Sequence, residues 1–212
     1  DDQVKHAKHG QWWEANPQRA LANNSAVYDT RPDVGLFFRE FTSLYDSKSG
    51  ERGFFSREAS KRQAARNERR DIDHDFGTNP CSEIILRPYQ FCNLTECVVR
   101  ADDTRDTLRR KVEAATILGT FQSALTNFKY LRKIWTTNTE EERLLGVSLT
   151  GILDHPTLHS DTALLNELRD LAVETNKVWA EKLGIPRSAA VTCVKPSGTV
   201  SQLVDSASGI HT

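Results

Sequence analysis

Residues 189–201 constrain the fold of this 212-residue chain more than any other stretch. Residues 189–194 read Ala-Ala-Val-Thr-Cys-Val, a short apolar run that predicts a buried strand. Residues 195–199 read Lys-Pro-Ser-Gly-Thr, which predicts a tight loop, and a helix is expected to begin at Val200. A strand, a tight loop and a helix in this order are typical of α/β proteins. The sequence therefore predicts an α/β fold.

Apolar residues spaced three and four apart predict three helices elsewhere. The first begins at Pro32, which we expect in its first turn. The second runs from Thr104 to about residue 135, and the third from a cap at Ser160 or Asp161 to a stop at Gly184. The apolar stripes of the two long helices are expected to lie in the core.

The stretch between the first and second of these helices is charged at first and then rich in loop-forming residues. Ser56 is expected to cap a charged, solvated helical segment that continues to residue 70. Residues 71–93 contain glycines, prolines and short β-branched runs, which predict loop and short strand. No repeat, linker or low-complexity run appears, so residues 1–212 are expected to form one continuous domain.

Bulk composition limits the function classes. The net charge is −1, from 28 basic and 29 acidic residues, which argues against a nucleic-acid or membrane-surface protein. The apolar stretches are too short to cross a bilayer. Four cysteines are too few for a disulfide scaffold, so a reducing, cytoplasmic location is the expectation. The chain has no methionine, even at position 1, and we expect it to be a piece of a longer polypeptide.

A proline-containing loop brings three reactive residue types close together in sequence. Asn79, Cys81 and Glu83 occupy alternate positions, and in an extended backbone they would point the same way. One face would then present an amide, a reactive sulfur and a general base to a small ligand. A buried cysteine beside a surface glutamate is the simpler alternative.

Cys92 lies eleven residues after Cys81, and Cys97 follows five residues later. This spacing does not match the close cysteine pairs of structural zinc sites, and no metal site is expected. Two thiols that face one pocket from different walls would suit redox chemistry. Cys97 and Cys193 are expected to be core thiols.

The loop before Val200 is a candidate phosphate site. Glycine lets backbone amides approach an anion, hydroxyls add donors, and a helix start favours negative charge. The residues expected to bind are Ser197, Gly198, Thr199, Val200 and Ser201. The order of residues is not that of a Walker loop, and an ordinary capped helix start remains the alternative.

Three motifs in this order resemble the catalytic chain of ribonucleotide reductases. They are Asn79-Pro80-Cys81-Ser82-Glu83-Ile84, Phe91-Cys92-Asn93-Leu94-Thr95-Glu96 and Lys195-Pro196-Ser197-Gly198-Thr199-Val200-Ser201. Further stretches at residues 23–28, 45–53 and 144–151 are most similar to the adenosylcobalamin-dependent class. The resemblance covers nearly the whole chain, although Thr212 stands where the family would have proline.

The resemblance implies part of a ten-stranded α/β barrel whose central finger loop carries Cys81. It implies that homolysis of the cobalt–carbon bond of adenosylcobalamin leads to a thiyl radical on Cys81, which abstracts the ribose 3′-hydrogen. Glu83 would deprotonate the 3′-hydroxyl, and Asn79 would hydrogen-bond the sugar. Cys92 would be one member of the reducing dithiol, with its partner upstream of residue 1.

The same resemblance implies a ribonucleotide substrate, a deoxynucleotide effector and a thioredoxin-like reductant. Asn23, Asn24 and Ser25 are similar to the loop that links the effector to the substrate base. Two alternatives stay open: a reductase class with a separate radical-generating subunit, and a catalytically inactive fragment. The sequence leaves the choice between di- and triphosphate substrates undecided.

Overall fold

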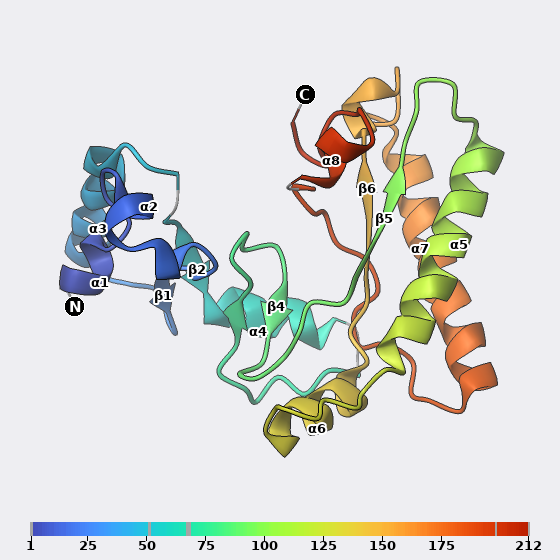
Figure 1. The fold of residues 1–212 in the computed structure, drawn as a ribbon, viewed down its shortest axis with the longest axis horizontal. Helices are drawn as coiled ribbons and strands as arrows, with labels where there is room; N and C mark the ends of the chain where they lie inside the picture. Colours follow the sequence, from blue (N-terminus) through green and yellow to red (C-terminus); the bar gives the residue numbers. More distant parts are fainter. Residues whose placement is uncertain (1, 51, 67–68, 198, 212) are drawn as a thin grey trace. The chain divides into compact units, whose positions relative to one another are not determined.

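The computed structural model describes residues 2–50, 52–66, 69–197 and 199–211. The chain divides into two compact units, Asp1–Pro88 (unit 1) and Tyr89–Thr212 (unit 2), each of which is described by itself (Figure 1). That residues 1–212 belong to one continuous domain stays a prediction.

Unit 1 combines short helices with two small sheets. In chain order its elements are α1 (Asp2–His6), α2 (Trp12–Ala15), the 3-10 helix η1 (Pro17–Arg19), β1 (Ala26–Tyr28), α3 (Val34–Ser47), β2 (Phe54–Ser56), α4 (Arg57–Ala65), β3 (Gly77–Thr78) and β4 (Ile85–Leu86).

Two strand pairs and a small core organise unit 1. β1 and β2 are parallel, and β3 and β4 are antiparallel. The core consists of Phe55, Ala64 and Phe76, with Ile85 packed against it. Arg57 Nε donates to the carbonyl of Phe76 (2.9 Å), which ties α4 to the chain just before β3. The β3–β4 hairpin is thereby fixed beside α4.

Only one of the two helices predicted in unit 1 begins where the sequence indicated. Ser56 accepts a hydrogen bond from Ala59 N (3.1 Å) and starts α4, as expected. α4 ends at Ala65, however, so the expected continuation to residue 70 is wrong. Pro32 is not in the first turn of α3, because Asp33 is the cap and accepts from Leu36 N (3.1 Å). No residue of α3 is buried.

Unit 2 is a layered α/β arrangement. Its elements are β5 (Leu94–Val98), α5 (Arg105–Ser123), α6 (Lys133–Glu142), β6 (Gly146–Thr150), the 3-10 helix η2 (Ile152–Asp154), α7 (Thr162–Leu183) and α8 (Val200–Leu203). β5 and β6 are parallel and in register from Leu94 opposite Gly146 to Val98 opposite Thr150. Parallel neighbours need a long crossover, and α5 and α6 supply it.

The expected strand at residues 189–194 lies beside β6 as a single parallel bridge between Val147 and Thr192. Backbone hydrogen bonds flank the bridge, from Leu145 N to Ala190 O (3.0 Å) and from Cys193 N to Val147 O (3.1 Å). A helix, α8, begins at Val200 as expected, although it has only 4 residues.

The two faces of the β5–β6 pair have different partners. Cys97, Val99 and Val147 point into the apolar core with residues of α5 and α7. Alternate residues point to the opposite face, where Ser148 and Thr150 contact the segment that leads to α8. Figure 1 shows α5 and α7 on one side of the strands and that segment on the other.

The predicted boundaries of the long helices are only partly right. α7 agrees with its prediction, since Asp161 caps it (2.9 Å to Leu164 N) and Gly184 ends it with φ 65°. The helix expected from Thr104 to about residue 135 is instead two helices, because α5 ends at Ser123 and α6 starts at Lys133. Thr104 is the cap of α5, so this helix begins where the apolar spacing predicted.

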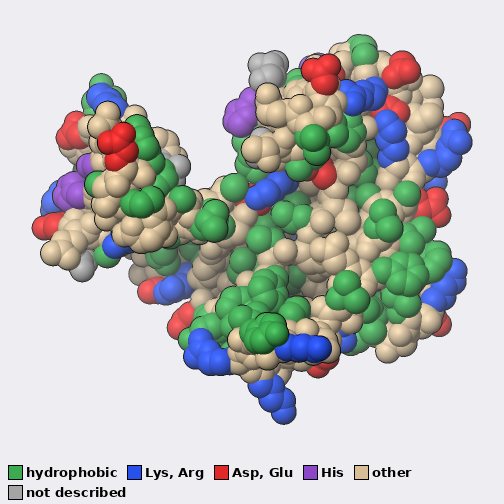
Figure 2. Space-filling view, viewed as in Figure 1, with side chains coloured by type: hydrophobic (Ala, Val, Ile, Leu, Met, Phe, Trp, Pro, Cys, Tyr) green, Lys and Arg blue, Asp and Glu red, His purple; other side chains and the backbone are tan. Residues whose placement is uncertain are grey.

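The α5 stripe is also only partly core. Leu108 and Val112 are buried, whereas Leu118, Phe121 and Leu125 are exposed. Figure 2 shows hydrophobic side chains gathered on unit 2 around α6 and the C-terminal end of α5.

The mixed content of helices and strands confirms the predicted α/β class. None of the helices in the described part of the chain is long and apolar enough to span a membrane.

Candidate active site

The loop that closes the β3–β4 hairpin carries Asn79, Cys81 and Glu83. Thr78 and Ile85 pair across the hairpin, so both ends of the loop start close together. Ser82 N donates to Asn79 O (3.0 Å), and Ser82 has a left-handed backbone with φ 68°. The loop is thus a turn rather than the extended segment that the sequence suggested.

This turn brings two of the three predicted side chains together. Asn79 Nδ2 donates to Glu83 Oε1 (2.7 Å), and Asn79 Oδ1 accepts from Ile84 N (3.0 Å). Asn79 is buried, and Cys81 is exposed at the turn between the two. The amide therefore holds the carboxylate in one orientation next to an accessible thiol, as a positioned base requires.

Asn23, three residues before β1, holds the same turn in place through hydrogen bonds. Its Nδ2 donates to Ser82 Oγ (2.7 Å) and to Pro80 O (3.0 Å), so one side chain holds residues on both sides of Cys81. Asn23 Oδ1 in turn accepts from Ser25 N (2.8 Å). The sequence assigned Asn23 to an effector loop and gave no hint of its contact with the cysteine loop.

Asn24 and Ser25 do not make such a contact with the Cys81 turn. The carbonyl of Asn24 accepts from Arg52 Nε (3.1 Å), and the Asn24 side-chain nitrogen is buried without a hydrogen-bond partner. Ser25 leads directly into β1. Their assignment to an effector loop stays a prediction.

Cys92 lies in unit 2, two residues before β5, and its side chain is exposed. It lines a cavity of about 310 Å³ whose other walls include Phe91, Phe128 and Leu144. The next residue, Asn93, donates to the carbonyls of Leu144 (3.0 Å) and Gly119 (3.2 Å). The backbone beside Cys92 is therefore anchored to the end of α5 and the start of β6.

The candidate phosphate residues differ in accessibility. Ser197 and Ser201 are buried, whereas Thr199 and Val200 are exposed. Val200 N donates to the carbonyl of Ser197 (3.1 Å). Gly198 lies outside the residues that the structure describes.

The hydroxyl of Ser197 faces the interior of unit 2. It lies 2.6 Å from Glu96 Oε1 and 2.7 Å from Thr150 Oγ1, and it accepts from Gly209 N (3.0 Å). Sequence reasoning gave Glu96 and Thr150 no role. The signal that was available is the alternation of Ser148 and Thr150 with apolar residues in β6, whereas Glu96 directly follows another polar residue in β5.

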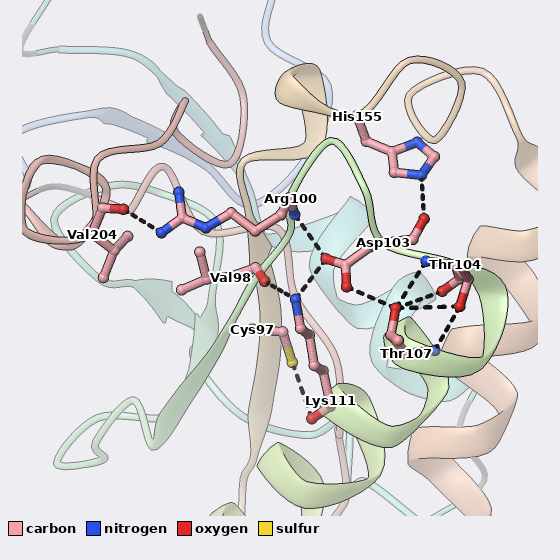
Figure 3. Close-up of polar contacts among 9 residues, drawn as sticks. All are labelled: Cys97, Val98, Arg100, Asp103, Thr104, Thr107, Lys111, His155 and Val204. Atoms are coloured by element: carbon pink, nitrogen blue, oxygen red, sulfur yellow. Dashed lines mark hydrogen bonds and ion pairs between the residues drawn. The ribbon is translucent and has the colours of Figure 1, made fainter.

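A second group of contacts holds α8 in place, and Figure 3 shows part of it. The Arg100 guanidinium donates to the carbonyls of Val204 and Asp205, just after α8. The backbone of Arg100 is fixed in turn, because its N–H donates to Asp103 Oδ2 (2.7 Å). Asp103 also accepts from Lys111 Nζ (2.6 Å).

The two remaining cysteines have different surroundings. Cys97 is a core residue, as predicted, and burial raises the pKa of its thiol to about 12. Cys193 is half-buried, and its sulfur lies close to Gly146, where an added Cβ would be 3.0 Å from it. The described residues contain no group of three or more His, Cys, Asp or Glu side chains that would hold a metal ion.

Comparison with known proteins gives a consistent set of relatives, although no protein-family model matches the chain. The adenosylcobalamin-dependent ribonucleoside-triphosphate reductase of Lacticaseibacillus paracasei is 27% identical over 91% of the chain and 29% of its own length. The corresponding Euglena gracilis enzyme is 27% identical over 94% of the chain and 27% of its own length. A probable enzyme of this kind from Dictyostelium discoideum is also 27% identical, over 94% of the chain.

A solved structure supports the same relationship at the level of the fold. The crystal structure of a B12-dependent class II ribonucleotide reductase superposes with a TM-score of 0.51 at 24% sequence identity. The match covers 62% of this chain and 22% of that one. The chain spans less than a third of the length of each of these relatives. By sequence and by fold, the chain is thus a relative of the adenosylcobalamin-dependent ribonucleotide reductases, at modest identity.

Proposed function

We propose that this chain carries the radical and redox residues of an enzyme that reduces ribonucleotides to 2′-deoxyribonucleotides. The observation that supports this most directly is the hydrogen bond from Asn79 to Glu83 across the turn that exposes Cys81. The names of the relatives favour ribonucleoside triphosphates as substrates. The fold proposed for the whole protein is the ten-stranded α/β barrel, with the Cys81 turn as its finger loop.

In the proposed reaction, the Cys81 thiol gives up its hydrogen atom and the resulting thiyl radical takes the 3′-hydrogen of the ribose. Glu83 accepts the proton of the 3′-hydroxyl, and the 2′-hydroxyl leaves as water with a proton from the dithiol. The dithiol, Cys92 and a partner thiol, also gives a hydrogen to the 2′-carbon, so that it loses two electrons and two protons and becomes a disulfide. Glu83 returns its proton to the 3′-oxygen, and Cys81 returns its hydrogen to the 3′-carbon, which regenerates the thiyl radical. Asn79 keeps Glu83 oriented throughout and is proposed to hydrogen-bond the sugar.

Adenosylcobalamin is the proposed cofactor, because the relatives are named for it. When bound, it would supply the radical that removes the hydrogen atom from Cys81. The exposed Cys81 fits this role, since a radical-generating group must reach the sulfur. We assign no residue of this chain to holding the corrinoid. A deoxynucleotide effector, a thioredoxin-like reductant and a cytoplasmic location belong to the same proposal.

A pair of cysteine variants in the full-length enzyme tests the assignment. We expect Cys81→Ser to abolish both deoxynucleotide formation and the thiyl-radical signal in electron paramagnetic resonance, because an alcohol O–H bond is too strong to replace the thiol. Cys92→Ser should retain the radical signal and lose turnover with the protein reductant, since the dithiol acts after hydrogen abstraction.

Cys193→Ser is the matched control, since this cysteine has no proposed chemical role, and it should leave both measurements near wild type. A normal radical signal in Cys81→Ser would remove that residue from its role. Full activity after cobalamin is removed would instead favour the reductase class with a separate radical-generating subunit.

A further inference from the structure

The buried position of Ser197 is unexpected for a residue that was predicted to bind phosphate. Its hydroxyl is in contact with Glu96 Oε1 (2.6 Å), Thr150 Oγ1 (2.7 Å) and the amide of Gly209 (3.0 Å). A hydroxyl has one hydrogen to donate and two lone pairs to accept with. Ser197 therefore donates its one hydrogen to the Glu96 carboxylate and accepts from Gly209 N, so its hydroxyl is already engaged inside the protein.

The partners of Ser197 come from the polar face of the β5–β6 pair. Glu96 is opposite Ser148 in the strand register, and Thr150 lies two residues beyond Ser148 on the same face. Ser148 Oγ accepts from Lys195 N (2.9 Å), two residues before Ser197. Thr150 donates its single hydroxyl hydrogen to Ala207 O (3.0 Å). The strands thus hold both the segment before α8 and the segment after it.

The backbone at Ser197 needs such support. Its φ of 70° lies in the left-handed region, which is unfavourable for a residue other than glycine unless the surroundings hold it there. Gly209 packs so closely that a Cβ on it would lie 1.9 Å from the carbonyl oxygen of Lys195. The amide of Gly209 is thereby directed at the Ser197 hydroxyl, and the turn is fixed on two sides.

We propose that Glu96 is a positioning residue for the substrate phosphate segment, and that it acts through the Ser197 hydroxyl. This inference rests on the proposed function together with the phosphate site predicted from the sequence, in which residues 197–201 take the phosphates of the nucleotide. Ser197 then shapes the segment without touching the nucleotide, and the exposed hydroxyl of Thr199 is the side chain that meets the phosphate.

The test compares nucleotide and nucleoside binding in the full-length enzyme. Glu96→Ala should raise the KM for the ribonucleoside triphosphate about tenfold, because the variant loses one hydrogen bond to a charged group. We expect kcat to change little. Glu96→Gln keeps a hydrogen-bonding group of the same shape and should restore the KM. The binding of the corresponding nucleoside, measured as inhibition, should be the same in all three proteins.

A double-mutant cycle separates positioning from direct contact. If Glu96 acts through Ser197, then Glu96→Ala combined with Ser197→Ala should raise the KM no more than either change alone. Thr150→Val should have the same effect as Ser197→Ala, and Thr150→Ser should not. Glu113→Ala, at an exposed glutamate of α5, is the control for loss of a negative charge.

Two outcomes would overturn the inference. One is an unchanged KM in Glu96→Ala while Thr199→Ala weakens nucleotide binding, which would leave the phosphate site standing without a role for Glu96. The other is an equal loss of nucleotide and nucleoside binding in Glu96→Ala, which would make Glu96 merely structural. If the unaltered enzyme binds nucleoside and nucleotide equally well, the proposed phosphate site itself is wrong.

Discussion

The carboxylate of Asp103 joins the end of β5 to the first turns of α5 (Figure 3). Its side chain is only 5% exposed and accepts from Lys111 Nζ (2.6 Å) and Thr107 Oγ1 (2.7 Å). Burial alone would raise the pKa of Asp103, but hydrogen bonds from Lys111, Thr107 and a backbone amide hold the pKa below its usual value of 3.8. The charged form is thus preferred in the folded chain.

Asp103→Asn should lower the free energy of unfolding at pH 7 by about 2 kcal/mol, because it weakens hydrogen bonds made to a charged group. A carboxylate with a depressed folded pKa stabilises the fold above its unfolded pKa, and that stabilisation is lost as the pH falls through the folded pKa. The difference between variant and wild type should therefore narrow as the pH falls below 3.8, the usual pKa of aspartate. Urea denaturation at pH 7 and at a pH below 3.8 measures this difference in unfolding free energy, and a difference independent of pH would contradict the role of the charge.

The high pKa of Cys97 predicts its reactivity. A thiol with a pKa of about 12 is almost wholly protonated at pH 8, and only the thiolate is nucleophilic. Iodoacetamide should therefore modify the exposed Cys81 and Cys92 in the native chain and leave Cys97 unmodified until the chain is denatured. Peptide mass mapping measures the rates, and rapid native modification of Cys97 would contradict its burial.

At the scale of elements, one side of α5 is buried along the whole helix, and some of its large apolar residues lie away from that side. Leu108 is 1% exposed and packs in the core with Val147 and Leu168, whereas Leu118 is 65% exposed. The buried side continues through Gly119 and Thr120 to Ser123. The spacing of apolar residues thus predicts the helix, whereas tertiary packing decides which of those apolar residues lie in the core.

Two leucine variants of α5 test this division. Leu108→Ala should lower the free energy of unfolding by about 2–5 kcal/mol, the range for truncating a buried leucine. Leu118→Ala is the matched control on the same helix, and it should change stability by no more than about 0.5 kcal/mol. Comparable losses for both variants would mean that Leu118 is also packed in the chain as it exists in solution.

At the scale of the whole molecule, the chain spans less than a third of its relatives' length and exposes many large apolar side chains. The proposed reaction needs a second thiol to pair with Cys92, and its thiyl radical must be shielded from water. Exposed apolar patches of this kind favour association or aggregation.

We therefore expect the isolated 212-residue chain to produce no deoxynucleotide over multiple turnovers when given adenosylcobalamin, ribonucleoside triphosphate and dithiol. We also expect it to bind a hydrophobic dye and to have low solubility. Chromatography of the reaction products measures deoxynucleotide formation, with the full-length enzyme as the positive control. Multiple turnovers by the isolated chain would show that the remaining segments are dispensable.

The sequence by itself determined the α/β class, the caps of α4 and α7, the start of α5, and the similarity to ribonucleotide reductases. These features depend on local residue order: caps satisfy nearby amides, apolar spacing reflects the helical period, and motifs are contiguous. The same locality explains why the break between α5 and α6 was missed, since the apolar spacing continues through a segment that is not helical.

Only the tertiary structure decided how the candidate site residues are held. The Asn79–Glu83 contact depends on a turn that Asn23 fastens from more than 50 positions away. The Ser197 hydroxyl meets Glu96, a residue 101 positions earlier in the chain. Such contacts join segments that only folding brings together, so residue order alone could nominate Ser197 for phosphate binding but could not reveal that its hydroxyl is already engaged.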